Sequence, residues 1–204
     1  LQVKERDEEA QDKHHRWKLN ESQLRRYNLG QALTPPRDWW EAIKIRPRKV
    51  TFANIGEEIT ICALICEDLA RQDPIADLIR TAGPSLVITI LMDGPQRKDR
   101  WSARYASVLA EDPGSAVVTL TSIGMVERWR VPNCPPSRSV ALWSDGEGES
   151  HEIELAQDSI GILLTLWLKP RKEPTIDGRR EENETNTLTL AGVHQIRSPP
   201  QGRD

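Results

Sequence analysis

The amino-acid sequence predicts an α/β fold built around a layered sheet. Three short apolar runs rich in β-branched residues, 60–65, 85–92 and 115–121, indicate core strands. Segments with a helical spacing of apolar residues separate these runs, and hairpin-like strands follow them. Strands that alternate with helices are typical of a sheet with helices packed against it.

The N-terminal part shows few regular patterns. Residues 1–16 are mostly charged and predict a loop, and 17–47, which contain Gly30 and a Pro-Pro pair, predict a long ordered loop rather than a helix. Residues 49–55 then alternate apolar and polar side chains, as a half-buried strand does, and a turn at 56–58 follows.

Two helices are predicted in the middle of the chain. The first has apolar residues at i, i+3 and i+4 and is ended by Gly83; these residues are Ile75, Leu78 and Ile79. The second is expected at 98–109, where three bulky side chains share one face: Trp101, Tyr105 and Val108.

The C-terminal part predicts more strands and then a polar tail. Strands are expected at 139–143, 151–155 and 160–168. Residues 170–185 are charged and poor in apolar side chains, which predicts mobility, and 188–196 predict a returning edge strand. We therefore expect one domain over residues 1–168 and a tail with one edge strand over 169–204.

Composition excludes some classes of function. The chain has 28 basic and 31 acidic residues, and a net charge of −3 provides no field that attracts nucleic acid. Three cysteines are an odd number, which favours a reducing compartment, and we expect the cytoplasm. The apolar runs are too short to cross a bilayer, so no membrane association is expected. Four histidines give no metal-ligand spacing.

Cys66 is the residue that most strongly suggests chemistry. It closes the run 60–65 and is followed at once by Glu67 and Asp68. A side chain at such a strand-to-helix turn projects from the sheet edge, where a helix N-terminus favours the thiolate and the next backbone N–H can hold an oxyanion. Most cysteines in apolar runs are packed in a core, an interpretation that suits Cys62 better.

The segment Ile65-Cys66-Glu67-Asp68-Leu69 resembles the nucleophile segment of the nitrilase superfamily of carbon–nitrogen hydrolases, especially its glutaminase-type branch. The similarity extends to Lys13 before a histidine pair, and to stretches at 74–79, 86–88, 101–106 and 139–146. Over residues 11–168 it implies a nitrilase-like αββα layered sandwich that is incomplete at the N-terminus.

This superfamily hydrolyses amides and nitriles with a Glu–Lys–Cys triad and needs no cofactor. The resemblance implies that Cys66 is the nucleophile, and that Lys13 and the backbone N–H of Glu67 stabilise the tetrahedral intermediate. The family's base glutamate lies upstream of the lysine, and no residue before Lys13 matches it, so the chain is expected to be truncated or inactive. Glu41 is the candidate for a second glutamate that some members carry, although a charge capping an aromatic turn explains it equally well.

A narrower resemblance points to partners. The Lys13 segment, the Trp39-Trp40-Glu41 segment and residues 65–77 and 91–95 are similar to the nitrilase-like domain appended to some bacterial reverse transcriptases of antiviral defence. It implies a fused or associated reverse transcriptase domain, a small amide or nitrile substrate, and a homo-oligomer in the complete protein. The Trp pair is expected to line a substrate pocket or a partner surface, or to be packed in the interior as most tryptophans are. Two functions stay open: an amidase-type hydrolase, or an inactive scaffold for oligomerisation or contact with a fused domain.

Overall fold

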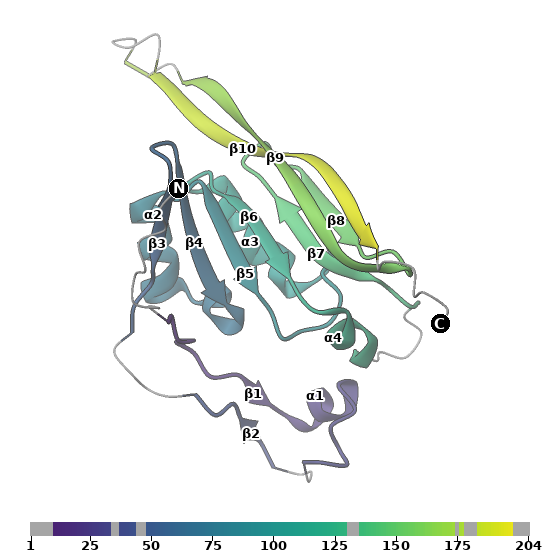
Figure 1. Ribbon diagram of the computed structural model, residues 1–204. Coiled ribbons are helices and arrows are strands. Elements are labelled where there is room, and N and C mark those ends of the chain that lie inside the picture. Colours follow the sequence, from purple (N-terminus) through teal and green to yellow (C-terminus); the bar gives the residue numbers. More distant parts are fainter. Residues whose placement is uncertain are drawn as a thin grey trace.

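A six-stranded mixed sheet forms the centre of the computed structural model, which describes residues 10–33, 37–43, 48–129, 135–173, 176–177 and 183–197 (Figure 1). Three neighbouring strands, the second to fourth of the sheet, run parallel, and the outer pairs are antiparallel. The strands follow sequence order across the sheet: β3 (Phe52–Ile55), β4 (Ile59–Ile65), β5 (Leu86–Ile90), β6 (Ala116–Leu120), β7 (Ser139–Ser144) and β8 (Ser150–Glu154). The predicted α/β class is confirmed.

Helices cover one face of this sheet. α2 (Asp77–Ala82) ends at Gly83, whose φ of 55° is the left-handed cap conformation that glycine adopts without strain. α3 (Trp101–Glu111) packs its alanines and Leu109 on the sheet. The core between them contains Cys62, Leu64, Ile75, Ile79, Val87, Ala106, Leu109 and Val117.

The faces predicted for these helices were partly wrong. Leu78 is 43% exposed, whereas Ile75 and Ile79 are buried as expected. In α3, Tyr105 and Val108 are exposed, because the small side chains on the opposite face let the helix approach the strands closely. The bulky residues are left at the rim of the sheet.

A long hairpin covers part of the other face of the sheet. β9 (Ser159–Glu173) and β10 (Asn183–Arg197) pair antiparallel. Alternate apolar residues of the hairpin pack against the sheet: Ile162, Leu164, Leu166, Leu168, Leu188 and Leu190. The expected edge strand is thus part of β10. The expected boundary at residue 168 falls inside β9, and both ends of the segment predicted to be mobile, 170–173 and 183–185, are strand.

The N-terminal segment contains a helix that the sequence prediction missed. β1 (Lys18–Leu19) pairs with β2 (Trp39–Trp40), and α1 (Glu21–Arg26) follows β1. Asn20 and Gln23 form a capping box, which stabilises the first turn even though glycine and prolines follow. A second short helix that the sequence prediction missed, α4 (Ile123–Arg128), begins after the Ser122 cap. The N-terminal segment with β1, α1 and β2 crosses the edge of the sheet at which β4 and β5 end (Figure 1).

Candidate active site

Cys66 lies at a strained turn directly after β4. Its φ is 51°, in the left-handed region that residues other than glycine rarely adopt. Strain of this kind persists where surrounding contacts enforce it, and it concentrates at functional sites. The turn that follows is a 3₁₀ helix, Cys66–Ala70, instead of the expected α-helix. The strand-to-helix turn is therefore present, in a tighter form.

The thiol of Cys66 is mostly protonated at neutral pH. Burial raises the pKa of the thiol, and the Lys13 ammonium and a hydrogen bond from the Met92 backbone N–H oppose this only in part. At 6% exposure burial outweighs these two contributions, and the effect of the short turn's N-terminus on the thiolate stays a prediction. Cys62 is fully buried, and its burial raises the pKa to about 12, as expected of a core thiol.

Lys13 and Glu41 form a buried ion pair beside Cys66. The Lys13 ammonium contacts the Glu41 carboxylate, and Lys13 is only 9% exposed. The same carboxylate accepts the Trp17 backbone N–H at 3.1 Å, while the backbone N–H of Glu41 donates to the Trp17 carbonyl at 2.9 Å. Arg16 Nε donates to the Glu41 carbonyl at 2.9 Å. Lys13 is thus held in place, and its charge reaches Cys66.

Asp68 holds the Lys13 segment against the cysteine turn. Its carboxylate is 1% exposed and accepts the backbone N–H groups of His14 and His15 at 3.0 and 2.9 Å. His15 Nδ1 lies 2.8 Å from the same carboxylate. A buried carboxylate is stable when such donors surround it. Because Asp68 is two residues after Cys66 and its partners directly follow Lys13, it couples the two candidate residues.

A second polar cluster follows the next strand, β5. Asp93 accepts hydrogen bonds from Arg100 and from Trp101 Nε1, both at 2.7 Å, and from the hydroxyl of Tyr27, the residue that caps the C-terminus of α1. Burial acts to raise the pKa of the Asp93 carboxyl, but these partners outweigh burial and lower it. Burial and the Asp93 charge raise the pKa of the Tyr27 hydroxyl. Asp93 therefore remains an anion that joins α1 to the sheet edge.

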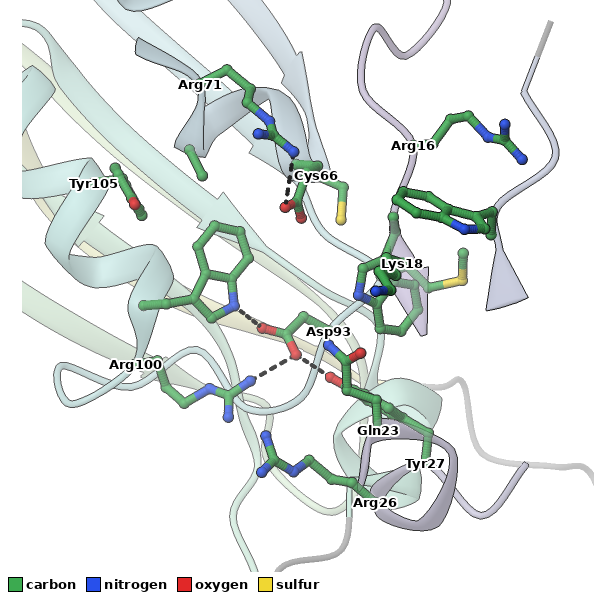
Figure 2. A pocket seen from close by; sticks show the side chains of 16 residues that line it. Arg16, Lys18, Gln23, Arg26, Tyr27, Cys66, Arg71, Asp93, Arg100 and Tyr105 are labelled. Atoms are coloured by element: carbon green, nitrogen blue, oxygen red, sulfur yellow. Dashed lines mark hydrogen bonds and ion pairs between the residues drawn. The ribbon is translucent and has the colours of Figure 1, made fainter. Parts of the chain in front are cut away.

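These elements enclose a pocket of about 520 Å³ (Figure 2). Its volume is in the range of small-molecule sites. The N-terminal segment forms one wall, and the cysteine turn and the start of α3 form the others. Its lining residues are Arg16, Trp17, Lys18, Gln23, Arg26, Tyr27, Trp40, Cys66, Glu67, Ala70, Arg71, Met92, Asp93, Arg100, Trp101 and Tyr105.

The structure brings the candidate residues together from three places in the chain. Lys13 and Glu41 are in contact, Lys13 acts on Cys66, and Trp40 lines the pocket. Glu67 points its carboxylate toward Arg71 at 3.6 Å, and the role of its backbone N–H stays a prediction. Sequence reasoning missed Asp93, although it follows a predicted parallel strand as Cys66 does, and parallel strands end at one edge.

Comparison with known proteins assigns no family to the chain: no protein-family model matches it, and no curated protein matches it significantly. Within the part of the chain that the structure describes, every helix is too short or too polar to cross a membrane. The function must therefore be argued from the pocket itself.

Proposed function

We propose that this chain is an amidase-type carbon–nitrogen hydrolase module in which Cys66 is the nucleophile. The observation that supports the proposal is the partly buried Lys13–Glu41 pair, whose ammonium acts on a cysteine that has a positive φ and lines a pocket. A nucleophile on a strained turn with a fixed cation next to it is the arrangement that acyl transfer requires. A nitrilase-like layering of the complete domain is part of this proposal.

The reaction begins with attack of the Cys66 sulfur on the carbonyl carbon of an amide. A C–S bond forms as the C=O π bond opens, the thiol proton passes to solvent water, and the carbonyl oxygen becomes an oxyanion that the Lys13 ammonium stabilises. The intermediate then expels an amine, which must take up a proton, and leaves a thioester. Water hydrolyses the thioester, so that amide and water give acid and amine and the thiol is restored.

Proton transfer is the weak part of this site. Glu41 is engaged by Lys13 and by the Trp17 N–H, and among the described residues no hydrogen bond joins its carboxylate to Cys66. We assign Glu41 to positioning Lys13, not to proton transfer. The expectation that the base glutamate is missing from this chain therefore stands as a prediction. Acid–base help is typically worth about 10²–10⁴-fold, so amide hydrolysis should be slow.

An activated ester separates attack by Cys66 from proton transfer to the leaving group, because p-nitrophenolate leaves without taking up a proton. We expect p-nitrophenyl acetate to give a burst of one p-nitrophenolate per chain, while ammonia release from simple amides is at least about 100-fold slower. Cys66→Ala should remove the burst, and Cys62→Ala, the matched core thiol, should keep it. Peptide mapping of the acetylated protein identifies the modified residue.

Two results would change the proposal. A burst that survives Cys66→Ala would exclude this cysteine as the nucleophile. Amide hydrolysis that depends on Cys66 and is as fast as the ester reaction would show that a proton donor lies within this chain, and Glu41 would become the leading candidate.

One observation favours a second function, the inactive scaffold. The outer side of the β9–β10 hairpin exposes large apolar side chains. Leu163 is 58% exposed and Trp167 is 61% exposed. Exposed apolar residues on one face are typical of protein contacts, including oligomers and fused domains such as a reverse transcriptase. Under this function the Cys66-dependent burst is absent, so the same experiment decides between the two.

A further inference from the structure

The pocket beside Cys66 is positively charged, although the chain as a whole has a net charge of −3. Two acidic side chains line it, Glu67 and Asp93, against five cationic ones, which leaves an excess of three positive charges. The cationic residues come from three separate regions of the chain, the N-terminal segment, the residue after the cysteine turn and the residue before α3, so they do not follow one helix face: Arg16, Lys18, Arg26, Arg71 and Arg100.

These cations differ in how far they are already neutralised. Arg100 is bound to Asp93 at 2.7 Å, and both side chains are nearly buried. Within the described residues the Arg71 guanidinium has an ion pair only with Glu67, at 3.6 Å, and the two side chains are 45% and 28% exposed. Arg26 takes part in no ion pair or hydrogen bond with the described residues, and it faces the pocket from α1 (Figure 2). Arg26 and Arg71 are thus available to an anion.

Aromatic side chains also line the pocket, beside these cationic residues. Trp40 is 53% exposed, and its ring has the Arg16 guanidinium 5.6 Å and the Lys18 ammonium 5.7 Å from its centroid. Trp17 packs edge-on against Tyr27 with centroids 5.5 Å apart. Aromatic faces and guanidinium planes both favour planar groups, such as an amide, a carboxylate or a ring.

We propose that the pocket takes an anionic acyl compound, in which Arg26 and Arg71 hold a carboxylate or phosphate while the amide carbon lies at the Cys66 sulfur. The inference rests on the proposed function for the identity of the reacting bond. The recognition of the anion rests on the pocket alone. Lys18 is already paired with Asp38 at 2.7 Å, outside the lining, so the excess charge of the pocket rests mainly on Arg16, Arg26 and the loosely paired Arg71. A neutral apolar substrate would give this charge no anion, which disfavours its binding.

A pair of alkylating reagents tests anion recognition without any turnover. Iodoacetate and iodoacetamide form the same kind of C–S bond with release of iodide, and they differ in one negative charge. We expect the ratio of their rates at Cys66 to exceed the ratio for glutathione by about tenfold, and to fall as salt is added. Peptide mapping gives the rate at Cys66 alone.

Three substitutions assign the effect to the pocket. Arg26→Gln and Arg71→Gln should each lower the ratio severalfold. Arg80→Gln removes the same charge from the end of α2, where Arg80 pairs with Asp77 and Asp112, and it should leave the ratio unchanged. A ratio equal to that of glutathione, or one that Arg80→Gln lowers as much as Arg26→Gln, would overturn the inference.

Binding to the Cys66→Ala variant provides a second measurement that does not depend on thiol reactivity. Three tryptophans line the pocket, so tryptophan fluorescence should report glutaramate at lower concentrations than the neutral glutaramide. Equal binding of the two would contradict anion recognition. Stronger competition by inorganic phosphate than by glutarate indicates a phosphate substrate, and the reverse indicates a carboxylate. Anion selectivity without any Cys66-dependent burst would leave this inference standing and remove the proposed function.

Discussion

Two hollows of similar volume lie on this molecule, and they differ in what lines them. The pocket beside Cys66 has about 520 Å³ and is lined by cations and aromatic rings. The groove between the sheet and the β9–β10 hairpin has about 590 Å³ and is lined almost entirely by aliphatic side chains of β5 to β9. The first lies where parallel strands end, and the second lies on a sheet face.

The difference shows that volume alone does not locate a reactive site. At the end of a strand, backbone groups leave the sheet and polar side chains can be held by them, as Asp68 and Asp93 are. On a face, neighbouring strands already satisfy the backbone, and only side-chain packing is left to fill the space. We therefore expect replacement of polar residues to affect the structure and reactivity of the pocket. Replacement of apolar residues should affect the packing on the groove side of the sheet.

The largest effect is expected from Asp68→Ala, which removes the carboxylate that holds the Lys13 segment against the cysteine turn. It leaves the buried N–H groups of His14 and His15 without their acceptor, so the free energy of unfolding should fall by about 3 kcal/mol or more. Urea denaturation measures this loss. Glu67→Gln, at the neighbouring and more exposed position, is the control and should change stability by less than about 1 kcal/mol. A similar small loss for Asp68→Ala would mean that the Lys13 segment is held elsewhere.

A smaller effect, confined to the hairpin side of the sheet, is expected from Leu188→Ala. Leu188 is 5% exposed and belongs to the same apolar core, between the sheet and the hairpin, as the residues that line the groove. A buried leucine replaced by alanine typically costs about 2–5 kcal/mol, and we expect about 2 kcal/mol. The selectivity of Cys66 for iodoacetate should not change. If it did, the groove and the pocket would be coupled and the distinction between them would fail.

The sequence predicted the groove side better than the pocket side, for a physical reason. Buried strands follow from short apolar runs rich in β-branched residues, and β4, β5 and β6 lie where those runs are. The turn at Cys66 was also predictable, since carboxylates follow an apolar strand directly. These signals come from neighbours in sequence.

The contacts that build the pocket join distant residues, and no local pattern encodes them. Lys13 lies in a charged stretch that suggests a solvated surface, yet its pairing with Glu41 buries it. Glu41 had two explanations, and its carboxylate makes contacts that fit both, with the Lys13 ammonium and with the Trp17 backbone N–H. The Asn20–Gln23 capping box was a usable local signal for α1, and with α1 came Tyr27 and the Asp93 cluster.

The smallest effect is expected from Glu67→Gln, measured as the reactivity of Cys66. The Glu67 charge contributes to the raised pKa of the thiol, so removing it should lower that pKa and increase the thiolate fraction at every pH below it. Because a less basic thiolate is also a weaker nucleophile, the gain in iodoacetamide alkylation near pH 8 should be only about twofold. The gain should disappear at pH values above the thiol pKa of both proteins, where Cys66 is fully ionised in each.

Lys13→Met should change the thiolate fraction of Cys66 in the opposite sense. The ammonium lowers the pKa of Cys66, so removing it should slow alkylation. Rates that move in the same direction in both variants would show that packing, and not charge, controls this thiol.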